Sequence, residues 1–185
     1  MPILAAMKTQ ERAWNDDWRE WVTDKAHGFV LEIGAGDGVN LEYYHSDAQV
    51  IATEPDAESI ELITDYQDNV TLAQVDAEDL PFPDESFDAV VGTLVFCTIP
   101  DAARALREVK RVLKPGGSLR LVEHVRAKNP VGRAFMQMAN PAWHWMTGGC
   151  NINRDTLSAV HAAGFQVIGT RKKMIGLIIG IDARK

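Results

Sequence analysis

The feature that most constrains this chain is an apolar strand that runs directly into a glycine-rich loop. Residues 29–33 read FVLEI, a run of apolar side chains typical of a strand, and residues 34–38 (GAGDG) follow at once. Glycine has no Cβ atom, so it permits a tight turn and lets a ligand approach the backbone closely. The pattern predicts the first strand of an α/β domain and a loop at its end that contacts a ligand.

Strand-like and helix-like segments alternate along the rest of the chain. Further strands are expected near residues 50–53, 70–75, 88–95, 118–125, 165–170 and 177–182, and helices near residues 5–25, 39–44, 59–63, 100–114 and 155–163. Alternation of this kind builds parallel βαβ units, whereas the short connection between the last two strands makes the final strand antiparallel. We therefore expect an α/β fold: a doubly wound, Rossmann-like sheet of seven mostly parallel strands with helices on both faces.

The segment between the fifth strand and the last helix is expected to hold two short helices. The second would begin with Asn140 as its N-cap and Pro141 as its first helical residue.

Composition and charge narrow the class of protein. Apolar residues make up 46% of the 185 residues and charged residues 24%, as in ordinary globular proteins. The net charge of −7 argues against a nucleic-acid partner, because neutralising phosphates requires a basic face. No apolar stretch is long enough for a transmembrane segment, so we expect at most peripheral contact with a membrane.

The two cysteines, Cys97 and Cys150, are too few for a disulfide framework and lack metal-type spacing. Neither has a basic neighbour in the sequence, so we expect both to be buried packing groups and predict no metal site. A reducing, cytoplasmic location fits this cysteine content.

Carboxylates stand at the ends of the second and third strands. Glu54 follows the glycine loop by about 20 residues, where a carboxylate can accept hydrogen bonds from both hydroxyls of a ribose. Asp76 is placed to accept the exocyclic amine of an adenine, although each carboxylate could equally be a solvated charge. A dinucleotide fingerprint would need a glycine at position 39, where Val39 stands, so a nicotinamide cofactor is disfavoured.

Four successive motifs make the comparison with a known family specific. EIGAGDG, TEPD, VDAEDLPFPDESFDAV and LREVKRVLKPGGSL resemble the motifs of class I S-adenosylmethionine-dependent methyltransferases of the ubiquinone-biosynthesis type, over about residues 29–125. The resemblance implies S-adenosylmethionine as cofactor and S-adenosylhomocysteine as product. It also implies which residues contact the methionine part, the ribose and the adenine of the cofactor. In chain order these residues are Glu32, Gly34, Ala35, Gly36, Gly38, Glu54, Pro55, Asp76, Ala77 and Thr93.

The acceptor side resembles a narrower group. TLVFC at residues 93–97, EHVR at residues 123–126 and NPAWHWMTGGCNINRD at residues 140–155 are similar to segments of small alkyl-thiol S-methyltransferases. His124 ends the fifth strand on the ligand side, so it is the candidate base or orienting group, or else a histidine bonded to a nearby loop. The side chains expected to line the acceptor pocket, with core packing as the alternative, are Trp14, Trp18, Trp143 and His144.

These observations predict a single domain with four parts. Residues 1–27 form an N-terminal helical cap, 28–125 the cofactor-binding core, 126–153 a helical insertion on the substrate side, and 154–185 a final helix and strand pair. The predicted function is direct methyl transfer to a small apolar acceptor, first of all a thiol, by a monomer or homodimer. Quinone precursors, phospholipid headgroups and a non-catalytic cofactor-binding module are the alternatives.

Overall fold

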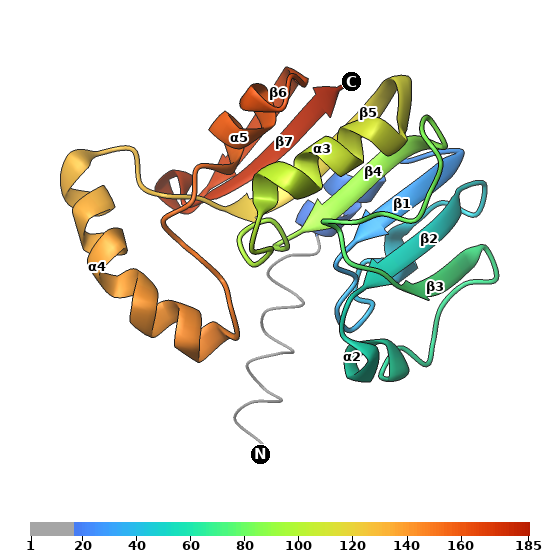
Figure 1. The fold of residues 1–185 in the computed structure, drawn as a ribbon, viewed down its shortest axis with the longest axis horizontal. Coiled ribbons are helices and arrows are strands. Elements are labelled where there is room, and N and C mark those ends of the chain that lie inside the picture. Colours follow the sequence, from blue (N-terminus) through green and yellow to red (C-terminus); the bar gives the residue numbers. More distant parts are fainter. Residues whose placement is uncertain (1–16) are drawn as a thin grey trace.

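The computed structural model describes residues 17–185, which form one mixed β-sheet flanked by helices (Figure 1). Residues 17–23 are helical; the preceding part of the helix expected over residues 5–25, with Trp14, lies outside the described residues. The later elements are β1 (Phe29–Ile33), η1 (Leu41–Tyr43), β2 (Gln49–Glu54), α2 (Ala57–Glu61), β3 (Val70–Gln74), β4 (Phe87–Thr93), α3 (Ala102–Val112), β5 (Leu113–His124), α4 (Pro130–Thr147), α5 (Thr156–Ala162), β6 (Gln166–Lys173), η2 (Met174–Gly176) and β7 (Ile178–Arg184).

The strand order is β3-β2-β1-β4-β5-β7-β6. The first five strands in this order are parallel, and β7 runs antiparallel to both of its neighbours. The predicted fold, with an antiparallel last strand, is confirmed. The chain builds outward from β1 to β3 and then returns to place β4 on the other side of β1, and in such sheets ligands bind at this reversal, beyond the carboxyl ends of the strands.

The core has two layers because both faces of the sheet are covered. On one face Leu31 and Ile33 of β1 pack in a cluster with residues of α3 and α5. On the other face Val30 packs with Trp18 and Val22 of the N-terminal helix. Burial on both faces explains why β1 reads as a nearly continuous apolar run instead of an alternating one.

The segment after the fifth strand forms one helix, α4, and not the two short helices expected from the sequence. It is one helix that begins at Pro130, where the Oδ1 atom of Asn129 accepts a 2.6 Å hydrogen bond from the Gly132 N–H. Pro141 lies inside it, and Asn140 donates its side-chain amide to Asn151 instead of capping a helix. The Asn-Pro signature occurs twice, and the first copy starts the helix. Within residues 17–185, no helix combines the length and the apolar character needed for a membrane span.

Strand β5 also differs from expectation. It begins at Leu113, where the expected helix was still running, and not at Ser118, and residues 114–117 (KPGG) form an irregularity within the strand. Pairing with β4 jumps from Phe87↔Leu113 to Ala89↔Ser118, which leaves extra residues on β5 at a bulge.

A buried arginine fastens the N-terminal helix to the sheet. Arg120 of β5 is 1% exposed and pairs with Asp182 of β7 at an N–O distance of 3.0 Å. Its guanidinium also donates to the backbone carbonyls of Trp21 and Val22 and stacks 4.5 Å from the Trp21 ring centroid. Because these partners satisfy a charge removed from water, Arg120 is tied to the last turn of the helix as well as to the sheet.

We predict that Arg120→Met destabilises the fold by about 3–5 kcal/mol, because it leaves Asp182 as an unpaired buried charge. Urea unfolding measures this change. Arg171→Met is the matched control: Arg171 pairs with Asp17 at the surface, where an ion pair contributes about 0–1 kcal/mol. Equal losses from the two variants would contradict the role assigned to Arg120.

Candidate active site

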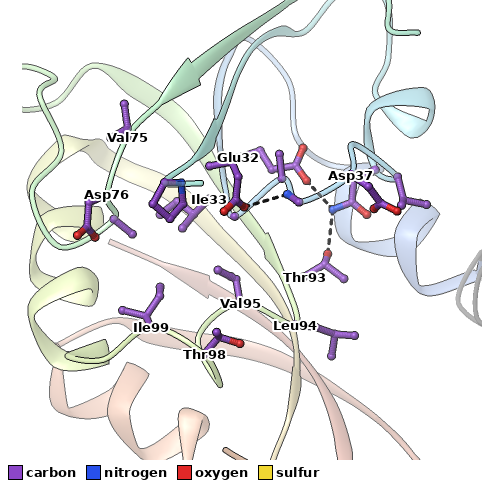
Figure 2. A pocket seen from close by; sticks show the side chains of 18 of the residues that line it. Glu32, Ile33, Asp37, Val75, Asp76, Thr93, Leu94, Val95, Thr98 and Ile99 are labelled. Carbon is purple, nitrogen blue, oxygen red and sulfur yellow. Dashed lines mark hydrogen bonds between the residues drawn. The ribbon is translucent and has the colours of Figure 1, made fainter. Parts of the chain in front are cut away.

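A cavity of about 550 Å³ opens at the carboxyl ends of the first four strands (Figure 2). Its walls come from the glycine loop after β1 and from the residues that follow β2, β3 and β4. A volume of this size suits a small-molecule or cofactor site. The predicted cofactor residues that line it are Glu32, Gly34, Ala35, Gly36, Glu54, Pro55, Asp76, Ala77 and Thr93.

Each glycine of the loop has a distinct structural role. Gly34, Gly36 and Gly38 all have positive φ angles, of 67°, 57° and 76°. A Cβ on Gly34 would lie 2.3 Å from Val95, and one on Gly38 would lie 2.9 Å from Ile63, whereas one on Gly36 would have no heavy atom within 4 Å. Gly36 therefore faces the open cavity. Gly38 does not line this cavity and packs closely against Ile63 at the turn, so its predicted ligand contact stays a prediction.

Glu32 is a buried carboxylate in the cavity wall. Its Oε1 atom accepts a 2.7 Å hydrogen bond from Asn40, and the buried Tyr44 hydroxyl lies beside the carboxylate. Burial raises the pKa of Glu32 to about 7, against the lowering effect of the Asn40 hydrogen bond. A carboxylate in the wall of a cavity is suited to a cationic ligand group.

The residues that orient Glu32 could not be identified from the sequence. The side-chain amide of Asn40 donates hydrogen bonds to Glu32 and, at 3.0 Å, to the Thr93 hydroxyl. The Oδ1 atom of Asn40 accepts a 2.6 Å hydrogen bond from Arg19. Asn40 follows the glycine loop closely, but no motif marks it. Arg19 stands among the tryptophans of the first helix, where only packing of that helix on the sheet brings it to the cavity.

The carboxylates after β2 and β3 lie along the same cavity wall. Glu54 accepts hydrogen bonds from the N–H groups of Gly36, at 3.0 Å, and Asp56, at 3.3 Å. Its position ties the glycine loop to β2. Asp76 accepts from the Glu78 N–H at 2.9 Å, and Figure 2 shows its side chain beside that of Val75 at the cavity edge.

A second cavity, of about 490 Å³, lies beneath α4. Its lining is mostly apolar and includes Phe135, Met136 and Trp143, with His124 at the end of β5 as the one titratable side chain among the described residues that line it. His124 and Trp143 thus share this cavity, as the sequence suggested for an acceptor pocket.

Two other residues predicted for the acceptor pocket lie elsewhere. His144 is exposed and does not line the cavity, because the neighbouring positions of α4 point in different directions. Trp18 is 2% exposed and packs against Gly180 of β7, where a Cβ would lie 2.9 Å from its ring. Trp18 therefore packs in the core, which was the alternative to a role in the acceptor pocket. Trp14 lies outside the described residues.

The two cysteines meet near His124. Their sulfur atoms are 3.3 Å apart, and the Cys150 sulfur lies 3.7 Å from Nδ1 of His124. The hydrogen bond between the sulfurs and the contact with His124 lower the pKa of Cys150 to about 4, against the opposing effect of burial. The same sulfur contact and burial raise the pKa of Cys97. Cys150 thus has a basic neighbour in space, although it has none in the sequence.

Comparison with known proteins identifies the family. The family described as Methyltransferase domain matches residues 31–121. The human protein named Thiol S-methyltransferase TMT1A is 32% identical over 167 residues, which are 86% of this chain and 68% of that protein. The Ubiquinone/menaquinone biosynthesis C-methyltransferase UbiE of Hahella chejuensis is 33% identical over 128 residues, covering 62% of this chain and 51% of that protein.

The chain belongs to the class I S-adenosylmethionine-dependent methyltransferases. A solved structure of a putative methyltransferase from Bacillus halodurans supports the fold, with a TM-score of 0.73, 20% identity and coverage of 87% of this chain and 94% of that one. This methyltransferase spans about half to two thirds of the length of the curated relatives named above.

The cavity at the strand ends fits the cofactor of this family. The Glu32 carboxylate in the cavity wall would receive the positively charged amino group of S-adenosylmethionine, and the open face of Gly36 allows close approach to the backbone. Glu32 near the end of β1 and Gly36 in the loop that follows lie at the sheet reversal where such ligands bind.

We predict that Gly36→Val abolishes S-adenosylhomocysteine binding, because the valine side chain would fill the cavity. Isothermal titration calorimetry measures the affinity. Gly116→Val is the matched control, since Gly116 also has a positive φ (74°) and open space around a Cβ but does not line the cavity. Both variants carry similar backbone strain, so binding by Gly36→Val as tight as by Gly116→Val would refute the geometry.

Proposed function

We propose that this methyltransferase transfers the methyl group of S-adenosylmethionine to a small, apolar thiol. The observation that carries the proposal is the apolar cavity under α4 with one titratable group, His124, at the end of β5. The relative named Thiol S-methyltransferase TMT1A supports the same acceptor class. In this proposal residues 126–153 form the acceptor-side segment, as the sequence predicted.

We assign three parts of the cofactor, the methionine part, the ribose and the adenine, to different residues of the chain. Glu32 and the glycine loop hold the methionine part, Glu54 holds the ribose hydroxyls, and Asp76 with Ala77 holds the adenine. All of these residues line the 550 Å³ cavity, and Glu54 also has carboxylate lone pairs beyond the two backbone hydrogen bonds that it accepts.

In this proposal one cavity holds the cofactor and the cavity under α4 holds the acceptor. The methyl carbon of a sulfonium is already activated, so the protein mainly has to align the acceptor in line with the breaking C–S bond and exclude water. Sulfur is intrinsically very nucleophilic, so a thiol requires less assistance than an amine or a hydroxyl. The acceptor sulfur forms the new C–S bond, its proton passes to His124 or solvent, and S-adenosylhomocysteine leaves.

Methylation of a quinone precursor is the second candidate. The apolar lining of the α4 cavity would accommodate a quinone ring as well as an alkyl thiol, and the relative named UbiE acts on that class of acceptor by its name. A phenolic oxygen or a ring carbon is a weaker nucleophile than sulfur and needs more help from a base, and His124 is the single titratable group among the described residues of the lining. This difference favours the thiol.

The raised pKa of Glu32 predicts a pH-dependent affinity for S-adenosylhomocysteine. The amino group of the ligand favours the ionised carboxylate, so below a pKa of about 7 binding must first remove the carboxyl proton. Affinity should therefore fall as the pH drops from 7 to 5, by up to about tenfold per pH unit. Calorimetry across this range should show a flat profile for Glu32→Gln and an unchanged profile for Glu58→Gln, an exposed control on α2. A wild-type profile that is also flat would remove Glu32 from the amino-group site.

The acceptor assignment predicts turnover on alkyl thiols. Formation of S-adenosylhomocysteine should be measured with purified protein and matched panels of alkyl thiols, amines, quinols and phospholipids, and we expect it with small alkyl thiols. Trp143→Ala should raise KM for the thiol, whereas Trp145→Ala should not, because Trp145 is 84% exposed and lines neither cavity. Product with quinols or lipids alone would contradict the thiol proposal, and no product with any acceptor would contradict catalysis on these classes.

A further inference from the structure

Three side chains from separate parts of the chain converge at one point between β4, β5 and the end of α4. Cys97 follows β4, His124 ends β5, and Cys150 follows α4. One ligand atom from each residue lies within 4.8 Å of the other two. Cys97 is 1% exposed and Cys150 9%, so the sulfur atoms lie in the interior and not at the surface.

The spacing of the sulfur atoms is closer to that of a metal site than to that of a disulfide. Two thiolates at about 2.3 Å from one tetrahedral zinc ion lie about 3.8 Å apart, and a thiolate and an imidazole nitrogen lie about 3.6 Å apart. The observed distances are 3.3 Å between the sulfurs and 3.7 Å between Cys150 and His124. A disulfide would require a sulfur separation of about 2.05 Å.

Backbone hydrogen bonds hold the cysteine-bearing loops in place. The Glu123 carboxylate accepts from the N–H groups of Val95, Phe96 and Cys97 at 2.8–3.1 Å. Asn151, which follows Cys150, donates its backbone N–H and its side-chain amide to the Cys97 carbonyl at 2.8 and 3.0 Å. The two loops are thus joined to each other and to β5, so the convergence of the ligand atoms is supported by the surrounding structure, as a binding site requires.

We propose that Cys97, His124 and Cys150 bind one divalent cation of the zinc class and leave its fourth coordination position open. Three protein ligands with an open position are typical of catalytic zinc, and thiolate and imidazole are the ligands that zinc prefers. Metal binding at this site would be a function separate from cofactor binding.

The open position would be taken by the sulfur of the acceptor, a step that rests on the proposed thiol specificity. His124 borders the apolar cavity under α4, so a thiol bound there lies next to the cation. A thiol that coordinates zinc is deprotonated, and its proton passes to solvent. The resulting thiolate forms a C–S bond to the methyl carbon as the sulfonium C–S bond breaks, and the neutral thioether product binds the cation more weakly and leaves.

Cobalt titration of the reduced, chelator-treated 185-residue chain tests the site without cofactor or acceptor. We expect a thiolate-to-cobalt charge-transfer band and tetrahedral ligand-field bands that saturate at one Co²⁺ per chain and are displaced by Zn²⁺. Cys97→Ser, His124→Ala and Cys150→Ser should each weaken binding by more than about 100-fold, since losing even a supporting outer partner costs about 10–100-fold. His161→Ala, an exposed histidine on α5, is the matched control and should bind as the wild type does.

The outcomes separate this proposal from the proposed function. A wild-type titration without a charge-transfer band, or unchanged affinity in Cys150→Ser, would overturn the metal site even if thiols are methylated. A Cys97–Cys150 disulfide formed with diamide in protein that binds no cobalt when reduced would identify a redox pair and also overturn it. Stoichiometric metal without thiol turnover would support the site and contradict the thiol acceptor. The wild-type titration decides the matter if a variant fails to fold, as judged by near-ultraviolet circular dichroism.

Discussion

The Glu123 carboxylate lies within the sheet, fully buried, and accepts hydrogen bonds from three consecutive backbone N–H groups of the loop after β4. Burial raises its pKa to about 7, while the three N–H groups act in the opposite direction. This interaction fixes the loop that contributes Leu94 and Val95 to the cofactor cavity and carries Cys97 toward His124. The position of this loop, with its cavity residues and Cys97, therefore depends on one side chain of β5.

The same strand joins the two faces of the sheet. Arg120 points to the face that carries the N-terminal helix and bonds to its last backbone carbonyls, and Arg19 of that helix reaches Asn40 beside Glu32. Glu123 holds the β4 loop in place, and His124 ends the strand at the apolar cavity. Charges buried at these points are individually costly, so each is matched with several partners. The cofactor cavity and the apolar cavity under α4 are thereby positioned by one central element.

Much of the fold followed from local patterns. Strands and helices were predictable where periodicity and glycine or proline punctuation agreed, as in β1 with its loop and α5 with its Asp155 cap. The expectation failed at α4, where a second Asn-Pro pair imitates a helix start. Asn140 bonds to Asn151 across space, so its side chain does not cap a helix, and a contact of this kind leaves no trace in the local pattern.

The sequence by itself determined the α/β architecture, and its motifs indicated the methyltransferase family and nine of the residues that line the cofactor cavity, because strand ends of a parallel sheet share one edge. Only the tertiary structure decided the burial of Trp18 in the core, the Arg19–Asn40–Glu32 contacts and the meeting of Cys97, His124 and Cys150. The physical reason is that periodicity reports the conformation of a segment, whereas these contacts join loops and faces separated along the chain and depend on how the elements pack.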